Sequence, residues 1–264
     1  MPLAQTALLA HAAFEAGNSL LGALRPGERS LLAGRLHWIE CYSGERLFSP
    51  GEDVRTAYFP LDGTTIALSI QLVDGREVHA GLIGREGAVG GIVSGGHKPA
   101  FARAEVETAG PILTLPHQDL HKAKARSSHL NDLFARYADC LFAQAMQTAA
   151  CNAFHSAEQR VARWLLFLSD RVGGREIPLT QDRLGAIIGA HRVTVLRGMR
   201  PLQALGLIDI RRSQVLIRDR SGLELRACEC RRAIQLHYER MLPGWHLPSE
   251  HERAAPKAHH ERPT

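Results

Sequence analysis

Residues 179–208 read LTQDRLGAIIGAHRVTVLRGMRPLQALGLI, and this stretch decides how the C-terminal part of the chain folds. The threonine near its start can cap a first helix, and Gly189 provides the tight turn that a helix-turn-helix requires. Val195, Met199 and Leu202 recur at helical spacing and give a second helix an apolar face that points inward. The stretch therefore predicts a helix-turn-helix.

The opposite face of the second helix carries the side chains that we expect to contact DNA. Arg192, Val193 and Arg197 are the predicted base-reading residues, because the major groove admits one helix and an arginine can bond guanine through two donors. The residues predicted to hold the DNA backbone or to position the helix are Thr180, Gln181, His191, Thr194, Arg200, Arg211 and Arg212. The alternative is an ordinary helical hairpin, since such patterns also arise by chance.

Positive charge is concentrated around this stretch. Residues 1–154 contain 13 Lys and Arg against 15 Asp and Glu, residues 155–242 contain 16 against 9, and residues 243–264 contain 3 of each. Such asymmetry favours a polyanionic partner, and double-stranded DNA is the one we expect. Residues 207–219 add two short alternating stretches around a polar turn, which predict a hairpin wing. A solvated basic face without a partner is the alternative.

The segment between residues 41 and 116 has a different texture. Glycine and proline recur every several residues, and the stretches between them alternate with period two. Ile66 and Leu68 point to one side while Ala67 and Ser69 point to the other, which predicts a half-buried strand. Short strands separated by such turns are typical of a small antiparallel barrel or jelly roll.

Between Pro116 and Gly173 the chain contains no glycine or proline, and the apolar residues recur at helical spacing. One seam has the alternating four- and three-residue spacing of a helix that packs along its whole length on another helix: Leu130, Phe134, Tyr137, Leu141, Gln144, Thr148 and Cys151. We expect a dimerisation helix here. Packing of this helix on its own domain is the alternative.

Together these patterns predict an α+β protein with a jelly roll, a long dimerisation helix and a winged helix-turn-helix. The predicted boundaries are a loosely ordered leader at 1–23, the jelly roll at 24–117, the long helix at 118–154, the winged helix-turn-helix at 155–242 and a disordered tail at 243–264. No apolar run approaches the roughly 20 residues of a spanning helix, and the N-terminus lacks the basic start of a signal peptide. We therefore expect a cytoplasmic protein without a membrane partner.

Five cysteines are spread along the chain, and we expect them to be structural thiols in a reducing compartment. Cys228 and Cys230 could join Cys140 and Cys151 in a redox or metal cluster, because nearby thiolates form a coordination set. Alternate residues of a regular helix point apart, however, so Cys228 and Cys230 are not expected to chelate together. We therefore predict no metal site.

In its order of parts the chain resembles the Crp/Fnr family of bacterial transcription regulators, over about residues 24–239. The stretches that carry the resemblance are SGERLFSPGE (43–52), AYFPLDG (57–63), GLIGREGAVG (81–90), AEQRVARWLLFLSDR (157–171) and LTQDRLGAIIGAHRVTVLR (179–197). The resemblance implies a homodimer that binds a near-palindromic DNA site with one recognition helix in each half-site. It also implies RNA polymerase as a further partner.

The resemblance assigns the recognition helix residue by residue. Regulators of the catabolite-activator type place Arg, Glu, Thr and Arg on the DNA, and here these positions are Arg192, Val193, Thr194 and Arg197. Val193 replaces the acid that accepts a hydrogen bond from cytosine, so the preferred half-site should differ at that base. Pro201 is a second departure, and we expect it to kink or end the helix in its third turn.

The effector pocket departs further from the family. Cyclic-nucleotide-binding members hold the ribose with a Gly-Glu pair and the cyclic phosphate with an Arg-Ser pair. Here the first pair is Gly84-Arg85 with Glu86 one place late, and the second is Lys98-Pro99. Pro99 has neither a hydroxyl nor an N–H, which argues against cyclic AMP and leaves the small-molecule effector unidentified.

Other sensors and other functions fit the sequence less well. No cysteine precedes Cys41, so the iron–sulfur cluster of the oxygen-sensing members is not expected, and no cofactor is predicted. His79 or His97 could serve as the ligand of the haem-sensing members. With Glu86 these histidines are also an incomplete version of the metal set of a cupin-like enzyme, but no catalysis is expected. The remaining alternative is a DNA-binding protein with a degenerate sensor domain that no ligand controls.

Overall fold

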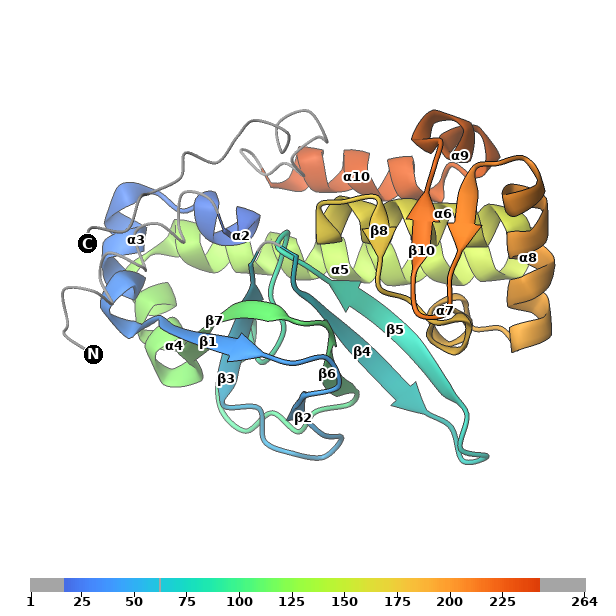
Figure 1. The fold of residues 1–264 in the computed structure, drawn as a ribbon. Coiled ribbons are helices and arrows are strands. Elements are labelled where there is room, and N and C mark those ends of the chain that lie inside the picture. Colours follow the sequence, from blue (N-terminus) through green and yellow to red (C-terminus); the bar gives the residue numbers. More distant parts are fainter. Residues whose placement is uncertain (1–16, 62, 243–264) are drawn as a thin grey trace, which may run out of the picture.

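The computed structural model describes residues 17–61 and 63–242. A β-rich N-terminal domain lies along one side of a long helix, α5 (Ser128–Phe154), and a helix-rich C-terminal domain packs towards the far end of that helix (Figure 1). The α+β architecture predicted from the sequence is confirmed. The predicted tail at 243–264 and residues 1–16 of the predicted leader lie outside the described residues. Among the described helices, none is long and apolar enough to cross a membrane.

The N-terminal domain is a jelly roll of two antiparallel sheets, with strand orders β1-β7-β3 and β2-β6-β4-β5. The strands are β1 (His37–Cys41), β2 (Arg46–Phe48), β3 (Thr56–Pro60), β4 (Thr65–Gln71), β5 (Glu77–Ile83), β6 (Arg103–Thr108) and β7 (Gly110–Pro116). The sheets enclose an apolar core that includes Ile66, Val106 and Ile112. Gly75, with φ of +83°, reverses the chain between β4 and β5 in a conformation that other residues rarely adopt.

Strand β4 differs from the half-buried strand that its sequence predicts. Ala67 and Ser69, on the side that a half-buried strand leaves open, are each only 2% exposed. Ala67 and Leu82 belong to the same apolar core as helix α6 (Ala157–Val172). The C-terminal domain therefore covers the outer face of this sheet. A single strand pattern gives no information about such a covering domain.

Within the described residues, two short α-helices and a 3₁₀ helix precede β1: α2 (Ser19–Gly22), α3 (Pro26–Leu32) and η1 (Ala33–Arg35). Leu20 and Leu21 are fully buried. The side-chain amide of Asn18 donates hydrogen bonds to two backbone carbonyls of the jelly roll, those of Pro60 and Gly87. The described end of the predicted leader is thus part of the domain core, and not loosely ordered as its composition suggested.

The single helix predicted over residues 118–154 is two helices, α4 (His117–Arg126) and α5. Ser127 separates them, because its backbone is extended and its side chain accepts a hydrogen bond from the Leu130 N–H at 3.1 Å. This is the geometry of an N-cap, which satisfies a backbone donor that the new helix cannot. The serine therefore starts α5 and sets the direction in which the helix crosses the molecule.

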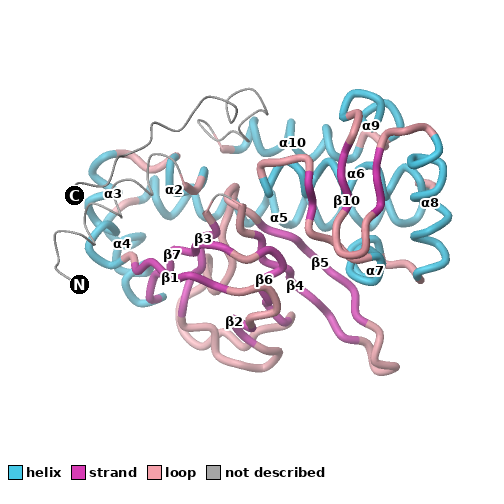
Figure 2. Tube along the Cα trace, in the orientation of Figure 1, coloured by secondary structure: helices cyan, strands magenta, loops and turns pink. Residues whose placement is uncertain are grey.

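The seam predicted for a second helix is covered by the chain itself. Phe134 packs edge-on against Phe59 of the jelly roll, and the Tyr137 hydroxyl donates to the Ala88 carbonyl at 3.1 Å. The last described helix, α10 (Cys230–Met241), runs beside α5 and packs against it (Figure 2). The alternative of packing on its own domain is therefore correct for this seam, and α10 joins the core under α5 although it was assigned to the winged domain.

The C-terminal domain is a winged helix-turn-helix. After α6 come β8 (Glu176–Ile177), α7 (Gln181–Ile188), α8 (Arg192–Ala204), β9 (Ile208–Ile210), β10 (Val215–Ile217) and α9 (Arg220–Arg226). The three strands form the wing in the order β8-β10-β9. Helices α6 and α8 cross at Gly198, where an added Cβ would lie 2.7 Å from the Ala157 carbonyl oxygen. Glycine is needed there because no larger residue fits between the two helices.

Candidate nucleic-acid interface

The turn between α7 and α8 has the geometry that the sequence predicts. The Thr180 hydroxyl caps α7 by accepting from the Arg183 N–H at 3.2 Å. Gly189 ends the helix in the left-handed conformation, with φ of +61°. Val195, Met199 and Leu202, on the inner side of α8, are fully buried. The apolar side of α8 is therefore fixed, and its other side is left to solvent.

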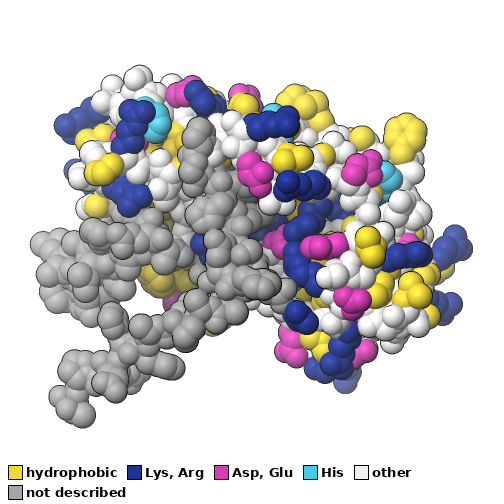
Figure 3. Space-filling model, turned by 90° about the horizontal axis from the view of Figure 1, so that it is seen from above, with side chains coloured by type: hydrophobic (Ala, Val, Ile, Leu, Met, Phe, Trp, Pro, Cys, Tyr) yellow, Lys and Arg dark blue, Asp and Glu magenta, His cyan; other side chains and the backbone are white. Residues whose placement is uncertain are grey.

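The solvent side of α8 carries the predicted base-reading residues. The side chain of Arg192 is 63% exposed and lies 4.0 Å from Asp182, and Val193 is 69% exposed. Arg197 and Arg200 are exposed and form no hydrogen bond or ion pair with any described residue. Lys and Arg side chains project around the end of the molecule at which α8 lies (Figure 3). These arginines are therefore free to meet phosphates or bases.

The residues predicted to hold the DNA backbone lie at the starts of α7 and α8, along α8 and in the turn of the wing: Thr180, Gln181, His191, Thr194, Arg200, Arg211 and Arg212. His191 precedes α8 as an exposed residue that makes no side-chain cap. Arg211 and Arg212 lie in the turn of the wing, where the Arg211 side chain is 3.7 Å from Glu176. Gln181 and Thr194 are only half-buried, so their side chains remain partly accessible. Their roles in DNA binding stay predictions.

Pro201 was expected to kink or end the recognition helix, and it does not end it. α8 runs on to Ala204, and the Pro201 carbonyl accepts a hydrogen bond from the Leu205 N–H at 3.1 Å. A proline lacks only its own N–H, so the helix loses a single bond to the carbonyl four residues earlier. The tight packing of Gly198 and Met199 beneath it holds the third turn in place.

Glu86, predicted for the effector pocket, already has a partner within the protein. Its carboxylate accepts two hydrogen bonds from Arg171 of α6, at 2.8 Å from Nε and 2.7 Å from Nη2, and both side chains are about 97% buried or more. The Gly84 N–H also donates to the Glu86 carboxylate at 3.0 Å. Arg85 is 9% exposed. This ion pair links the jelly roll to the C-terminal domain.

Lys98, the other predicted effector residue, lies in a different place. Its ammonium donates to the Gly96 carbonyl at 2.6 Å and lies 3.1 Å from Nδ1 of His117. The cleft at Lys98 is lined by Asp53, Arg55, Gly96, Lys98, Pro116, His117 and Gln118. None of Gly84, Arg85 and Glu86 lines it. The structure therefore does not bring the four predicted effector residues into one cleft.

Among the described residues, neither histidine considered for haem or a cupin-like metal set belongs to a group of converging ligands. His79 is buried, and this burial lowers its pKa to about 4 while Arg183 and Arg103 act in the same direction. His97 is exposed and lies 3.2 Å from Asp53. Glu86 is held by Arg171. Within the described part of the chain, these residues do not converge as a metal set.

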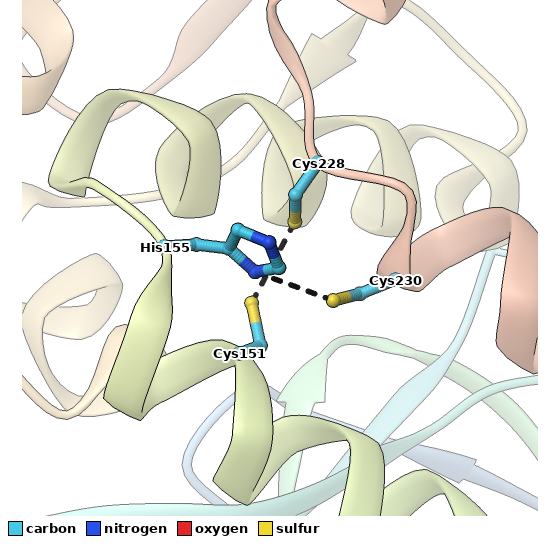
Figure 4. A group of neighbouring side chains, drawn as sticks. All are labelled: Cys151, His155, Cys228 and Cys230. Atoms are coloured by element: carbon cyan, nitrogen blue, oxygen red, sulfur yellow. Dashed lines mark hydrogen bonds between the residues drawn. The ribbon is translucent and has the colours of Figure 1, made fainter.

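A different group of potential ligands does converge. The ligand atoms of Cys151, His155, Cys228 and Cys230 all lie within 4.8 Å of one another (Figure 4). Cys228 and Cys230 were not expected to bind one ion together, since alternate residues of a regular helix point apart. This prediction was wrong, because Cys228 lies in the loop before α10. The hydrogen bond with Cys228 lowers the pKa of the Cys151 thiol, and the charge of Arg163 acts in the same direction. The four-residue spacing of Cys151 and His155 was the overlooked signal.

Comparison with known proteins agrees with this geometry. Residues 159–226 match the Crp-like helix-turn-helix domain. FixK2 from Bradyrhizobium japonicum superposes with a TM-score of 0.63 at 18% identity, over 73% of this chain and 98% of that one. TTHB099, a CRP-family transcriptional regulator from Thermus thermophilus, superposes with a TM-score of 0.60 at 21% identity, over 72% of this chain and 96% of that one.

A third similar structure is CLP, a c-di-GMP-responsive global regulator from Xanthomonas campestris. Its TM-score is 0.57 at 18% identity, over 73% of this chain and 99% of that one. The three TM-scores show a shared fold, and at identities this low they show nothing beyond the fold. No curated protein matches the sequence significantly.

Proposed function

We propose that this chain is a Crp/Fnr-type transcription regulator that binds a near-palindromic operator as a homodimer, since it contains a Crp-like helix-turn-helix domain and shares its fold with such regulators. Each α8 would enter the major groove of one half-site. Arg192 and Arg197 would read bases there, while the wing residues Arg211 and Arg212 would contact phosphates.

The observation that carries this proposal is the state of the arginines on α8. Arg197 and Arg200 are exposed and have no partner among the described residues, although acidic side chains are frequent elsewhere on the chain. An arginine on a groove-sized helix, held by a buried apolar face and free of internal ion pairs, keeps its donors available for guanine or phosphate.

A second seam on α5 supports the homodimer. Once the predicted seam is covered by the chain itself, another remains open, with spacings of three, four, three and four: Ala135, Ala138, Phe142, Ala145 and Ala149. Phe142 is 65% exposed, and Met146 beside it is 52% exposed. Alanines allow two helices to approach closely, and a seam of this period matches a copy of itself across a two-fold axis. We therefore assign the dimer contact to this outer seam.

Phe142→Glu tests the assignment. Two glutamates would face each other across the two-fold axis, so we expect the dimer dissociation constant to rise by about 100-fold or more. Analytical ultracentrifugation of the purified chain measures it. Val73→Glu is the matched control, because Val73 is another exposed apolar residue but lies in the β4–β5 turn. A Phe142→Glu protein that dimerises as the wild type does would refute the seam.

We propose an unidentified small molecule as the effector of the N-terminal domain. The cleft at Lys98 supports it, because Arg55 and Lys98 together exceed the charge of Asp53, the acid that lines the same opening, and so favour an anionic ligand. The competing function is DNA binding without ligand control. The engagement of Glu86 by Arg171 favours it, since that carboxylate already has a guanidinium partner inside the protein.

Selection of bound duplexes from a random DNA pool tests the whole proposal. The purified full chain is used at near-physiological salt in three arms: without nucleotide, with cyclic AMP and with c-di-GMP. A palindromic motif in every arm supports a dimeric reader that these nucleotides do not control. A motif in one nucleotide arm only identifies the effector. The absence of any enriched motif in all three arms would overturn operator binding that needs no ligand or that either of these two nucleotides controls.

A further inference from the structure

Four potential metal ligands meet where the long helix ends. Cys151 lies in the last turn of α5, and His155, four residues later, is the residue that caps the C-terminal end of this helix. Cys228 comes from the loop after α9, and Cys230 is the first residue of α10. Figure 4 shows the three sulfur atoms and the imidazole directed towards a common point. Two segments distant in sequence therefore supply two ligands each.

The spacing of these atoms suits one tetrahedral ion. A tetrahedral centre with Zn–S bonds of about 2.3 Å holds two thiolates about 3.8 Å apart, and a thiolate about 3.5 Å from a ligating nitrogen. In the structure Sγ of Cys151 lies 3.6 Å from Sγ of Cys228, and Sγ of Cys230 lies 3.5 Å from Nδ1 of His155. An iron–sulfur cluster would need more room, because several iron and sulfide atoms must fit between its thiolates.

The surroundings of the ligands support the same conclusion. The second ring nitrogen of His155, Nε2, lies 3.3 Å from the carboxylate of Glu229. A carboxylate that accepts this N–H fixes the imidazole with Nδ1 free to ligate, an arrangement common around bound zinc. Gln147 donates an N–H to Sγ of Cys230 at 3.1 Å, a bond that suits a thiolate.

A buried arginine provides the matching charge. Arg163 of α6 is fully buried, and its Nε and Nη1 have no hydrogen-bond partner among the described residues. Its Nη2 donates to Thr148 of α5, one turn before Cys151. An uncompensated buried guanidinium is costly. Three thiolates, a neutral imidazole and Zn²⁺ carry a net charge of −1, which would balance this arginine.

We propose that Cys151, His155, Cys228 and Cys230 form a structural Zn²⁺ site that joins the end of α5 to the α9–α10 segment. The ion would clamp the junction between the long helix and the DNA-binding domain, since α6 begins directly after His155 and Ser156. All four coordination positions are filled by the protein, as in structural zinc sites. The site does not depend on the proposed function, and its test needs no DNA.

Metal binding is measured on the full chain, reduced and freed of metal. We expect one Zn²⁺ per chain by elemental analysis of protein purified without chelator. Competition with a chromophoric chelator should give a dissociation constant of about 50 nM or tighter. Co²⁺ in place of Zn²⁺ should give the intense visible absorption of a tetrahedral thiolate site. Zinc at about 1,000 times the dissociation constant should raise the melting temperature by roughly 10 °C.

Three variants separate coordination from folding. Cys228→Ser should weaken binding by about 100-fold or more and reduce the thiolate absorption per bound Co²⁺, because one of three thiolates is lost. Cys140→Ser is the matched control, because Cys140 is another buried thiol of α5 that lies outside the group, and it should bind as the wild type does. Glu229→Gln changes an exposed side chain that does not threaten the fold, and it should weaken binding by about 10- to 100-fold.

Three results would overturn the proposal. The first is a reduced, folded chain that takes up neither Zn²⁺ nor Co²⁺ at micromolar concentration. The second is equal affinity of the wild type, Cys228→Ser and Glu229→Gln for Zn²⁺, which would place the metal elsewhere. Recovery of a Cys151–Cys228 disulfide from a freshly purified, metal-free chain would also refute it and would identify the group as a redox pair.

Discussion

Two groups of arginines in the C-terminal domain have opposite environments. Arg192, Arg197 and Arg200 project from α8 into solvent, whereas Arg163 and Arg171 on α6 are 0% and 3% exposed. Both groups contribute to the excess of Lys and Arg over residues 155–242. The same excess of arginine therefore contains two kinds of charge. Some charges are exposed and available to a polyanion, and others are buried and hold domains together.

The buried group gives the largest expected effect. Arg171→Leu removes the partner of Glu86 and leaves a carboxylate buried between two domains. We expect a loss of about 3 to 5 kcal/mol in the free energy of unfolding, because an unpaired buried charge is costly. Urea denaturation of the purified chain measures this loss.

A second substitution distinguishes the charge from the packing. Arg171 also lies over the ring of Phe167, so part of any loss could come from that contact. Arg171→Leu combined with Glu86→Gln removes both charges and should recover most of the stability. If the free energy of unfolding of Arg171→Leu alone lay within about 1 kcal/mol of the wild type, the ion pair would not be what joins the domains.

The exposed group should affect DNA and not stability. Arg197→Ala should lower affinity for the selected operator by about 1 to 3 kcal/mol, or roughly 5- to 150-fold, and should relax preference at one base of each half-site. Its free energy of unfolding should stay within about 0.5 kcal/mol of the wild type. Quantitative binding to the operator and to single-base variants measures both affinity and preference.

Arg240→Ala is the matched control for this change. Arg240 is an exposed arginine near the end of α10, away from the helix-turn-helix, and its loss should leave the preference for bases unchanged. Unchanged affinity and unchanged preference in Arg197→Ala would mean that the recognition face has been assigned to the wrong side of α8.

The sequence was sufficient for the helix-turn-helix because its determinants are consecutive. A cap, a turn glycine and one apolar stripe lie within residues 179–208, and each acts on its immediate neighbours. The same local patterns were also enough for the jelly roll and for the helical character of α5. They could not show the break at Ser127, because one capping serine is a weak signal within a long helical pattern.

Features that depend on distant contacts were missed. A helical period shows that α5 has an apolar face, but it does not show that α10 and the jelly roll cover that face. Cys151 and Cys228 are 77 residues apart, and they meet only because α10 returns along α5. Glu86 was expected to face a ligand, but its carboxylate faces Arg171, and this contact exists only because α6 docks on the jelly roll.

Arg212→Ala gives the smallest effect and the sharpest contrast with Arg197→Ala. Arg212 is exposed in the turn of the wing, where we expect a contact to phosphate and none to a base. Its loss should weaken every duplex by the same few-fold factor and reduce the slope of log affinity against log salt by about 1 per chain. Titrations of the operator and of a scrambled duplex at several salt concentrations measure both quantities, with Arg240→Ala again as the control. A change confined to the operator would place Arg212 among the base-reading residues, and the division between the wing and α8 would then not hold.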